Sequence, residues 1–70
     1  MTFIKNFILN GQLYSTNSDI TLYDIITYLN YKDSLLVLEY NNKICNKKKW
    51  KQKIIKNNDK IEIVTIVGGG

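Results

Sequence analysis

The chain has no means of cross-linking its own fold. It contains 70 residues with a single cysteine, Cys45, and no histidine, so neither an internal disulfide nor a zinc site of cysteine and histidine ligands can form within it. Ordering a chain of this length costs on the order of 100 kcal/mol of conformational entropy, so its apolar residues must pack efficiently. A chain this short has too few residues to build a second hydrophobic core. The sequence therefore predicts one small domain that is stabilised by packing alone. Because Ser/His and Cys/His nucleophile pairs are excluded as well, we do not expect the chain to be an enzyme on its own.

The amino-terminal part predicts a β-hairpin. Residues 2–9 are rich in β-forming side chains, and Asn10-Gly11 is the dipeptide that most readily adopts a type I′ turn. Residues 12–16 then form a short second strand, with Leu13 on one face and Tyr14 on the other.

One helix follows this hairpin. Thr21 is a suitable N-cap, with Asp24 three residues later to complete a capping box. The apolar residues after the cap repeat at helical spacing and form one stripe, namely Leu22, Ile25, Ile26 and Leu29. Such a stripe fits a helix that lies on a sheet, and Asn30 is expected to end it in the left-handed conformation.

The second half predicts three more strands. Residues 34–40 are apolar on both faces, as in a central strand, and Asn41-Asn42 predicts a tight turn into residues 43–45. Residues 47–56 predict an irregular segment or a single helical turn, and residues 60–67 alternate as a last strand. The predicted fold class is therefore α+β, a mixed sheet of four to five strands with one helix packed across one face.

Ten lysines against six acidic residues give a net charge of +4, and most of the lysines lie within residues 47–56. Nucleic acid is not an expected partner, because the chain has no arginine for bidentate base contacts and only Trp50 lies among these lysines for stacking. We expect a solvated basic face with Trp50 as a packing residue. A small basic RNA-binding protein remains the alternative, and it would show a steep dependence of RNA affinity on salt.

The sequence gives no sign of a membrane segment or a secretion signal. The apolar run at residues 7–9 is too short for either, so we expect the protein to remain where it is made, in the cytoplasm or in a plastid stroma. Isoleucine, lysine and asparagine dominate, while alanine, arginine, proline and histidine are missing. This bias is typical of AT-rich codons and suggests a plastid or a reduced bacterial genome.

Three of the four glycines are the last three residues, Gly68, Gly69 and Gly70. A segment without Cβ atoms can lie extended in a narrow channel and bring its backbone close to a nucleotide phosphate. The reacting group would then be the α-carboxylate, which is a poor electrophile until it is activated, most simply as an acyl-adenylate. We accordingly divide the chain into a domain of residues 1–67 and a glycine tail of residues 68–70. The alternative is a disordered terminus without function.

The last predicted strand carries a second indication. Ile61 and Ile63 share its inner face, while Val64 and Ile66 follow Glu62 on the other face. If one helix covers one side of the sheet, Val64 and Ile66 form an exposed apolar patch that leads to the tail, which is typical of a docking surface. A loop that covers them is the alternative.

The remaining reactive side chains predict structural roles. Cys45 lacks a neighbouring histidine or a CxxC motif and is expected to be a small, half-buried residue. Asp24, Asp33 and Asp59 lack the spacing of a metal site, and capping or turn formation accounts for them. We therefore expect no metal and no cofactor bound by this chain.

Several segments together resemble the ThiS-type sulfur carriers of thiamine biosynthesis. They are LVLEYNNKI at residues 36–44, Trp50, and NDKIEIVTIVGGG at residues 58–70, with the Asn10-Gly11 turn and the helix start at residues 21–26 in agreement. The resemblance spans nearly the whole chain, and its most specific part is residues 63–70. It implies a ubiquitin-like β-grasp fold.

The resemblance also implies a chemical role. Gly70 would be adenylated by an E1-like adenylyltransferase, which uses ATP and magnesium, and then converted to a thiocarboxylate that donates sulfur to thiazole synthase. The sulfur would come from a donor such as a cysteine desulfurase. Gly69 would complete the diglycine, and Val64, Ile66, Val67 and Gly68 would contact the partners.

Two departures and two alternatives accompany this resemblance. Asn46 stands where the family usually has proline, and the lysines before Trp50 make that segment unusually basic. Both departures bear on the expected shape of this loop and not on the chemistry of the glycine tail. The small subunit of molybdopterin synthase shares the fold and the diglycine but binds its own large subunit. A ubiquitin-like modifier would instead form isopeptide bonds with target lysines.

Overall fold

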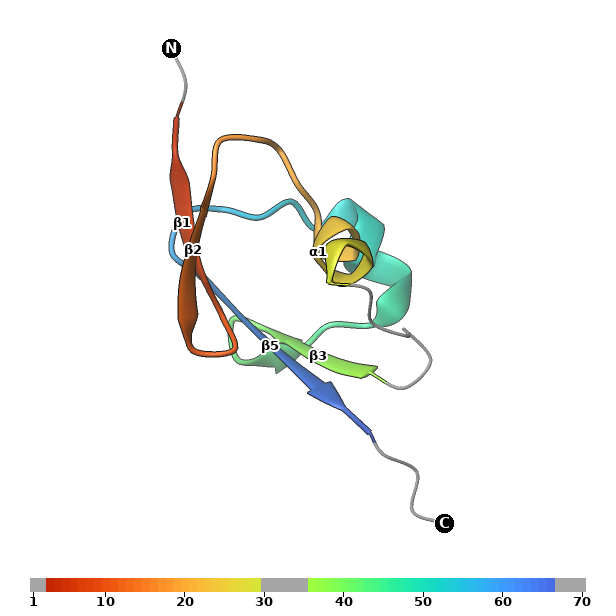
Figure 1. The fold of residues 1–70 in the computed structure, drawn as a ribbon. Helices are drawn as coiled ribbons and strands as arrows, with labels where there is room; N and C mark the ends of the chain where they lie inside the picture. The colour runs from red at the N-terminus through yellow and green to blue at the C-terminus, as the bar shows by residue number, and fades with distance from the viewer. Residues whose placement is uncertain (1–2, 30–35, 67–70) are drawn as a thin grey trace.

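The computed structural model describes residues 3–29 and 36–66, and these form a five-stranded sheet with its helices on one side (Figure 1). The elements in chain order are β1 (Lys5–Leu9), β2 (Gln12–Thr16), α1 (Leu22–Tyr28), β3 (Leu36–Tyr40), β4 (Lys43–Ile44), the 3₁₀ helix η2 (Lys47–Gln52) and β5 (Asp59–Thr65). The predicted α+β class and the predicted order of elements are confirmed.

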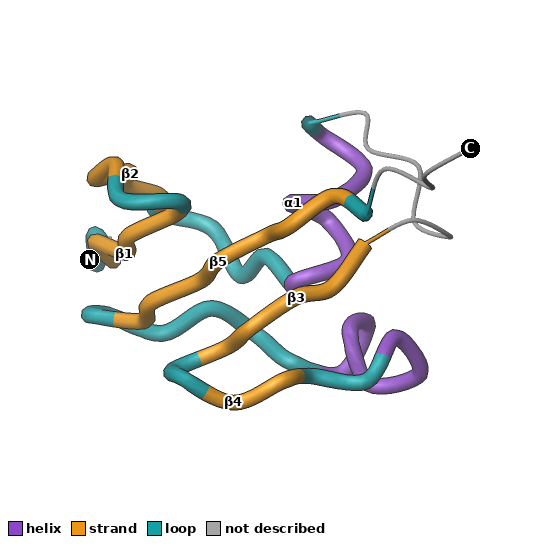
Figure 2. The backbone as a smooth tube through the Cα atoms, turned by 90° about the horizontal axis from the view of Figure 1, so that it is seen from below, coloured by secondary structure: helices purple, strands orange, loops and turns teal. Residues whose placement is uncertain are grey.

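The strands lie side by side in the order β2-β1-β5-β3-β4, which can be followed in Figure 2. The last strand, β5, is at the centre, parallel to β1 and antiparallel to β3. Residues 34–40 were expected to form a central strand. The described part of this segment, β3, lies inside the sheet between β5 and the two-residue β4, so this prediction is confirmed for residues 36–40. The middle position of the five belongs to β5, because β5 also pairs with β1.

The first hairpin has the turn that its sequence predicts. Asn10 and Gly11 both adopt positive φ, at 50° and 81°, as a type I′ turn requires. The turn is also attached to β5, because the Asn10 backbone N–H donates to the Ile61 carbonyl at 2.9 Å and the Asn10 side-chain oxygen accepts from the Ile63 N–H at 2.7 Å. The asparagine therefore both shapes the hairpin and holds it to the central strand.

The helix α1 begins with the predicted capping box. The Thr21 hydroxyl accepts a hydrogen bond from the Asp24 backbone N–H at 3.1 Å, and the Asp24 carboxylate accepts one from the Thr21 N–H at 2.9 Å. Leu29 caps the other end in the right-handed conformation. Asn30, the predicted end of the helix, lies outside the described residues.

The core lies between the helices and the inner face of the sheet. The sheet contributes five buried side chains, Phe7, Leu9, Leu38, Ile61 and Ile63, and α1 contributes Leu22, Ile25 and Ile26. Trp50 and Ile55, from the crossover between β4 and β5, complete the core and are almost fully buried. The predicted packing role of Trp50 is thus confirmed, and its indole N–H donates to the Cys45 carbonyl at 3.0 Å.

The structure explains how asparagine replaces proline at residue 46. Asn46 has φ of −64°, the value that a proline ring imposes, and ψ of 138°. Its side-chain oxygen accepts a hydrogen bond from the Lys48 backbone N–H at 2.9 Å and so caps η2. The crossover therefore keeps a proline-compatible backbone and gains a cap, and η2 extends over six residues rather than a single turn.

Candidate functional site: the end of the central strand

The strand that leads toward the glycines is held firmly at its start. Asp59, the first residue of β5, is buried and accepts three hydrogen bonds, from the Tyr40 hydroxyl at 2.5 Å, the Asn41 side-chain amide at 3.1 Å and the Lys56 backbone N–H at 2.7 Å. Burial raises the pKa of Tyr40 above its usual range, and the hydrogen bond to the Asp59 carboxylate raises the pKa further. These contacts tie β5 to the end of β3 and fix the register of the pair.

The other end of β5 presents apolar side chains to solvent. Val64 and Ile66 are 53% and 51% exposed, whereas Ile61 and Ile63 on the inner face are buried. Within the described residues no loop covers this side of β5, since the helices pack against the opposite face (Figure 1). The predicted exposed patch at Val64 and Ile66 is therefore present, and its contact with partners stays a prediction.

The apolar surface around Val64 extends beyond the patch of Val64 and Ile66 that the sequence predicts. By the strand register, Val37 lies opposite Val64 on β3, and Ile8 lies opposite Leu13 at the other edge of the sheet. Both Ile8 and Leu13 are exposed, and so is Ile44 on β4. The uncovered face also carries charges, because Glu62 lies opposite Glu39 and forms an ion pair with Lys60 at 3.5 Å. The sequence signal for this face was the period-two alternation, but it becomes a surface only once the strand order is known.

The predicted tail residues, Val67, Gly68, Gly69 and Gly70, lie outside the described residues, as does the boundary between the domain and the tail. What the structure establishes is that the chain reaches them from the central strand of the sheet, after the exposed Ile66.

The basic segment offers no stacking surface for nucleic acid. Trp50 is 2% exposed, so its ring is not available to a base. The ammonium group of Lys51 lies 4.6 Å from the centre of the Tyr23 ring, and this cation–π contact ties η2 to α1. The geometry of the segment is that of a packed crossover with lysines on its outer side.

The remaining reactive groups of the described chain form no catalytic or metal cluster. Cys45 is half-buried, as predicted, and its backbone N–H donates to the Leu38 carbonyl at 2.8 Å. No group of three or more potential metal ligands occurs in residues 3–29 and 36–66. Over the same residues, no helix has the length and apolar character that crossing a membrane requires.

Comparison with known proteins agrees with the sequence and the fold. The family model described as ThiS family matches residues 7–70, which is most of the chain. The chain belongs to the ThiS family. A solved structure, the thiamine biosynthesis protein ThiS from Geobacter metallireducens, superposes with a TM-score of 0.77 over 93% of this chain and 99% of that chain, at 18% sequence identity. The ubiquitin-like β-grasp fold implied by the sequence resemblance is thereby confirmed.

Relatives in sequence are closer than this structural match. A protein named "Uncharacterized protein ycf40" from Trieres chinensis is 62% identical over 66 residues, covering 94% of this chain and 90% of the relative. A protein of the same name from Porphyra purpurea is 29% identical over 62 residues, covering 89% and 87%. The chain and these relatives thus align over nearly their full lengths.

Proposed function

We propose that this protein is a sulfur carrier for the formation of the thiazole moiety of thiamine. The observation that carries the proposal is the match of the ThiS family model through Gly70, the residue that would bear the sulfur. The central position of β5 supports it, because a strand hydrogen-bonded on both sides gives the segment after it a rigid base. The chain acts here as a co-substrate of partner enzymes and not as an enzyme.

The proposed chemistry takes place at the α-carboxylate of Gly70. A carboxylate oxygen attacks the α-phosphate of ATP in an E1-like adenylyltransferase, and pyrophosphate leaves to give an acyl-adenylate. The terminal sulfur of a persulfide, formed by a donor such as a cysteine desulfurase, then attacks the carbonyl carbon, and AMP leaves with the electron pair of the broken C–O bond. A thiol attacks the donor's sulfur in the resulting acyl disulfide and forms a disulfide with it, and the two electrons of this thiol release the terminal sulfur as a thiocarboxylate on the chain. The thiocarboxylate that results keeps its sulfur bound to the chain until thiazole synthase takes it. ATP and magnesium belong to the activating enzyme.

Recognition by these enzymes is proposed to use the exposed end of β5. Val64 and Ile66 offer apolar surface that becomes buried on docking, and Gly68 and Gly69 let the backbone enter a narrow active-site channel. The same surface would serve the activating enzyme and the synthase in turn, because each must reach the same carboxyl group. A plastid stroma is the proposed location, supported by the excess of isoleucine, lysine and asparagine and by the ycf40 designation of the relatives.

Exchange of labelled pyrophosphate into ATP tests the activation step. With an E1-like adenylyltransferase of this family, the full chain should support exchange, and a chain that lacks Gly69 and Gly70 should not. Exchange that continues without the two glycines would contradict activation at the terminal carboxylate.

Partner capture distinguishes the proposed role from the two alternatives, a molybdopterin synthase small subunit and a ubiquitin-like modifier. Immobilised carrier should retain thiazole synthase. Retention of a molybdopterin synthase large subunit would assign the chain to that pathway, and ladders of isopeptide-linked species on a denaturing gel would assign it to protein modification.

A further inference from the structure

The edge of the sheet at β2 has none of the features that usually prevent pairing with another strand. Among the strands of residues 3–29 and 36–66, β2 pairs only with β1, and its sequence QLYST contains no lysine, no acidic residue and no proline. The opposite edge, β4, has only two residues and includes Lys43. Of the two edges, β2 alone is long enough and uncharged enough to accept a further strand.

The free hydrogen-bonding groups of β2 can be assigned from its register. Leu9 and Gln12 flank the two-residue turn and form a hydrogen-bonded pair, so Tyr14 and Thr16 also direct their backbone groups toward β1. The alternating residues Leu13 and Ser15 direct their N–H and C=O groups away from the sheet. Only a partner with extended backbone can supply the complementary row of donors and acceptors.

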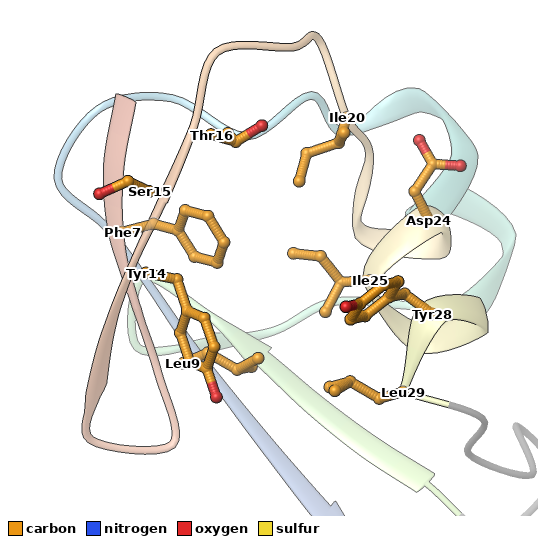
Figure 3. A pocket seen from close by; sticks show the side chains of 10 residues that line it. All are labelled: Phe7, Leu9, Tyr14, Ser15, Thr16, Ile20, Asp24, Ile25, Tyr28 and Leu29. Atoms are coloured by element: carbon orange, nitrogen blue, oxygen red, sulfur yellow. The ribbon is translucent and has the colours of Figure 1, made fainter. Parts of the chain in front are cut away.

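A pocket lies directly beside this edge, between the hairpin and α1 (Figure 3). Its volume is about 440 Å³. Phe7, Leu9 and Ile25 line its floor and are buried. Tyr14 from β2 and Tyr28 from α1 reach into it from facing sides, and Tyr28 is 88% exposed. The pocket is therefore preformed, mainly apolar and open to solvent.

The pocket and the β2 edge together fit an added β-strand. Side chains of an added strand alternate between the two faces of the sheet, so every second side chain would enter the pocket beside Tyr14. The others would lie next to Leu13, which is 71% exposed on the uncovered face. Among the residues that the structure places around the pocket, Asp24 carries the single charge, and its carboxylate favours a basic residue in the partner.

We infer that β2 and this pocket bind an extended peptide segment of a partner protein, which adds a strand to the sheet and inserts an apolar side chain next to Phe7 and Ile25. β1 separates β2 from β5, so this contact leaves the end of β5 open. The carrier can thus be held by one protein while another acts on its carboxyl terminus. This surface is independent of the proposed function and would exist for any partner of the carboxyl group.

Selection from a phage-displayed library of random peptides on the immobilised full chain tests the inference. Enriched peptides should carry apolar residues at every second position and a basic residue at one end. When they are added to ¹⁵N-labelled protein, the amide signals of β2 and α1 should shift, and those of β4 should not. Failure to enrich any peptide, or shifts confined to other surfaces, would overturn the inference. So would β2 shifts that appear without peptide and grow with protein concentration, because these would indicate a second copy of the chain as the occupant.

Two matched pairs of variants locate the contact. Tyr28→Ala should weaken binding of a selected peptide about tenfold, whereas Tyr23→Ala, on the same helix but not in the pocket, should leave it unchanged. Leu13→Pro removes the outward N–H and should weaken binding more than Leu13→Ala, which keeps it. Thermal unfolding midpoints confirm that each variant is folded. Equal affinities within either pair of folded variants would contradict the proposed mode of binding.

Discussion

The hydrogen bond between Tyr40 and Asp59 gives the sharpest test of how β5 is held. Tyr40→Phe removes one hydroxyl and leaves the ring in place. The lost bond has a charged, buried acceptor, and such bonds contribute about 2 kcal/mol to the free energy of unfolding. A domain of this size is stable by roughly 4 to 10 kcal/mol, so the loss is a large part of the total.

Urea unfolding followed by Trp50 fluorescence measures this loss, because Trp50 is the single tryptophan of the chain and is buried. With a slope of about 1 kcal/mol per molar urea, the midpoint of Tyr40→Phe should fall by about 2 M. Tyr14→Phe is the matched control, since the Tyr14 hydroxyl donates to the neutral and exposed side chain of Gln12, and its midpoint should change by less than about 0.5 M. If both variants unfolded at the same urea concentration, Asp59 would not anchor the strand as argued.

Three further outcomes follow from the structure. The free energy of unfolding should fall as pH rises above 10, the ordinary pKa of tyrosine, because burial and Asp59 raise the pKa of Tyr40 in the folded state only. The fall should be smaller in Tyr40→Phe, and an equal fall in both proteins would contradict the pKa shift. Gly11→Ala should cost about 1 kcal/mol in urea unfolding, because φ is 81° while a new Cβ meets nothing within 4 Å; an unchanged midpoint would argue against the positive φ. Val64→Glu should weaken binding of the activating enzyme about tenfold in calorimetry, whereas Ile54→Glu, at a similarly exposed site away from the sheet, should not; equal effects would refute a docking role for Val64.

Local signals predicted much of this fold. Asn10-Gly11 and the pair Thr21 and Asp24 act through contacts within a few residues, so their turn and cap could be derived from the sequence and are confirmed. The alternation along β5 likewise predicted that Val64 is exposed. These features depend on backbone geometry that nearby residues dictate.

Long-range pairing could not be derived in the same way. The central place of β5 depends on its parallel pairing with β1, about fifty residues earlier in the chain, and no local pattern encodes that contact. Asp59 was interpreted as part of a polar turn because Asn57 and Asn58 precede it. In the structure, Asp59 is instead the buried acceptor at the start of β5. This role depends on the hydroxyl of Tyr40, which is 19 residues away in the chain.

Intact-mass spectrometry of the carboxyl terminus tests the central proposal most directly. After incubation with the activating enzyme, ATP and a sulfur donor, the full chain should gain the mass difference between one sulfur and one oxygen atom, and fragmentation should place the gain on Gly70. A chain without Gly69 and Gly70 should show no gain. If the full chain kept its original mass while the enzyme consumed ATP, the protein would not be the carrier of this sulfur.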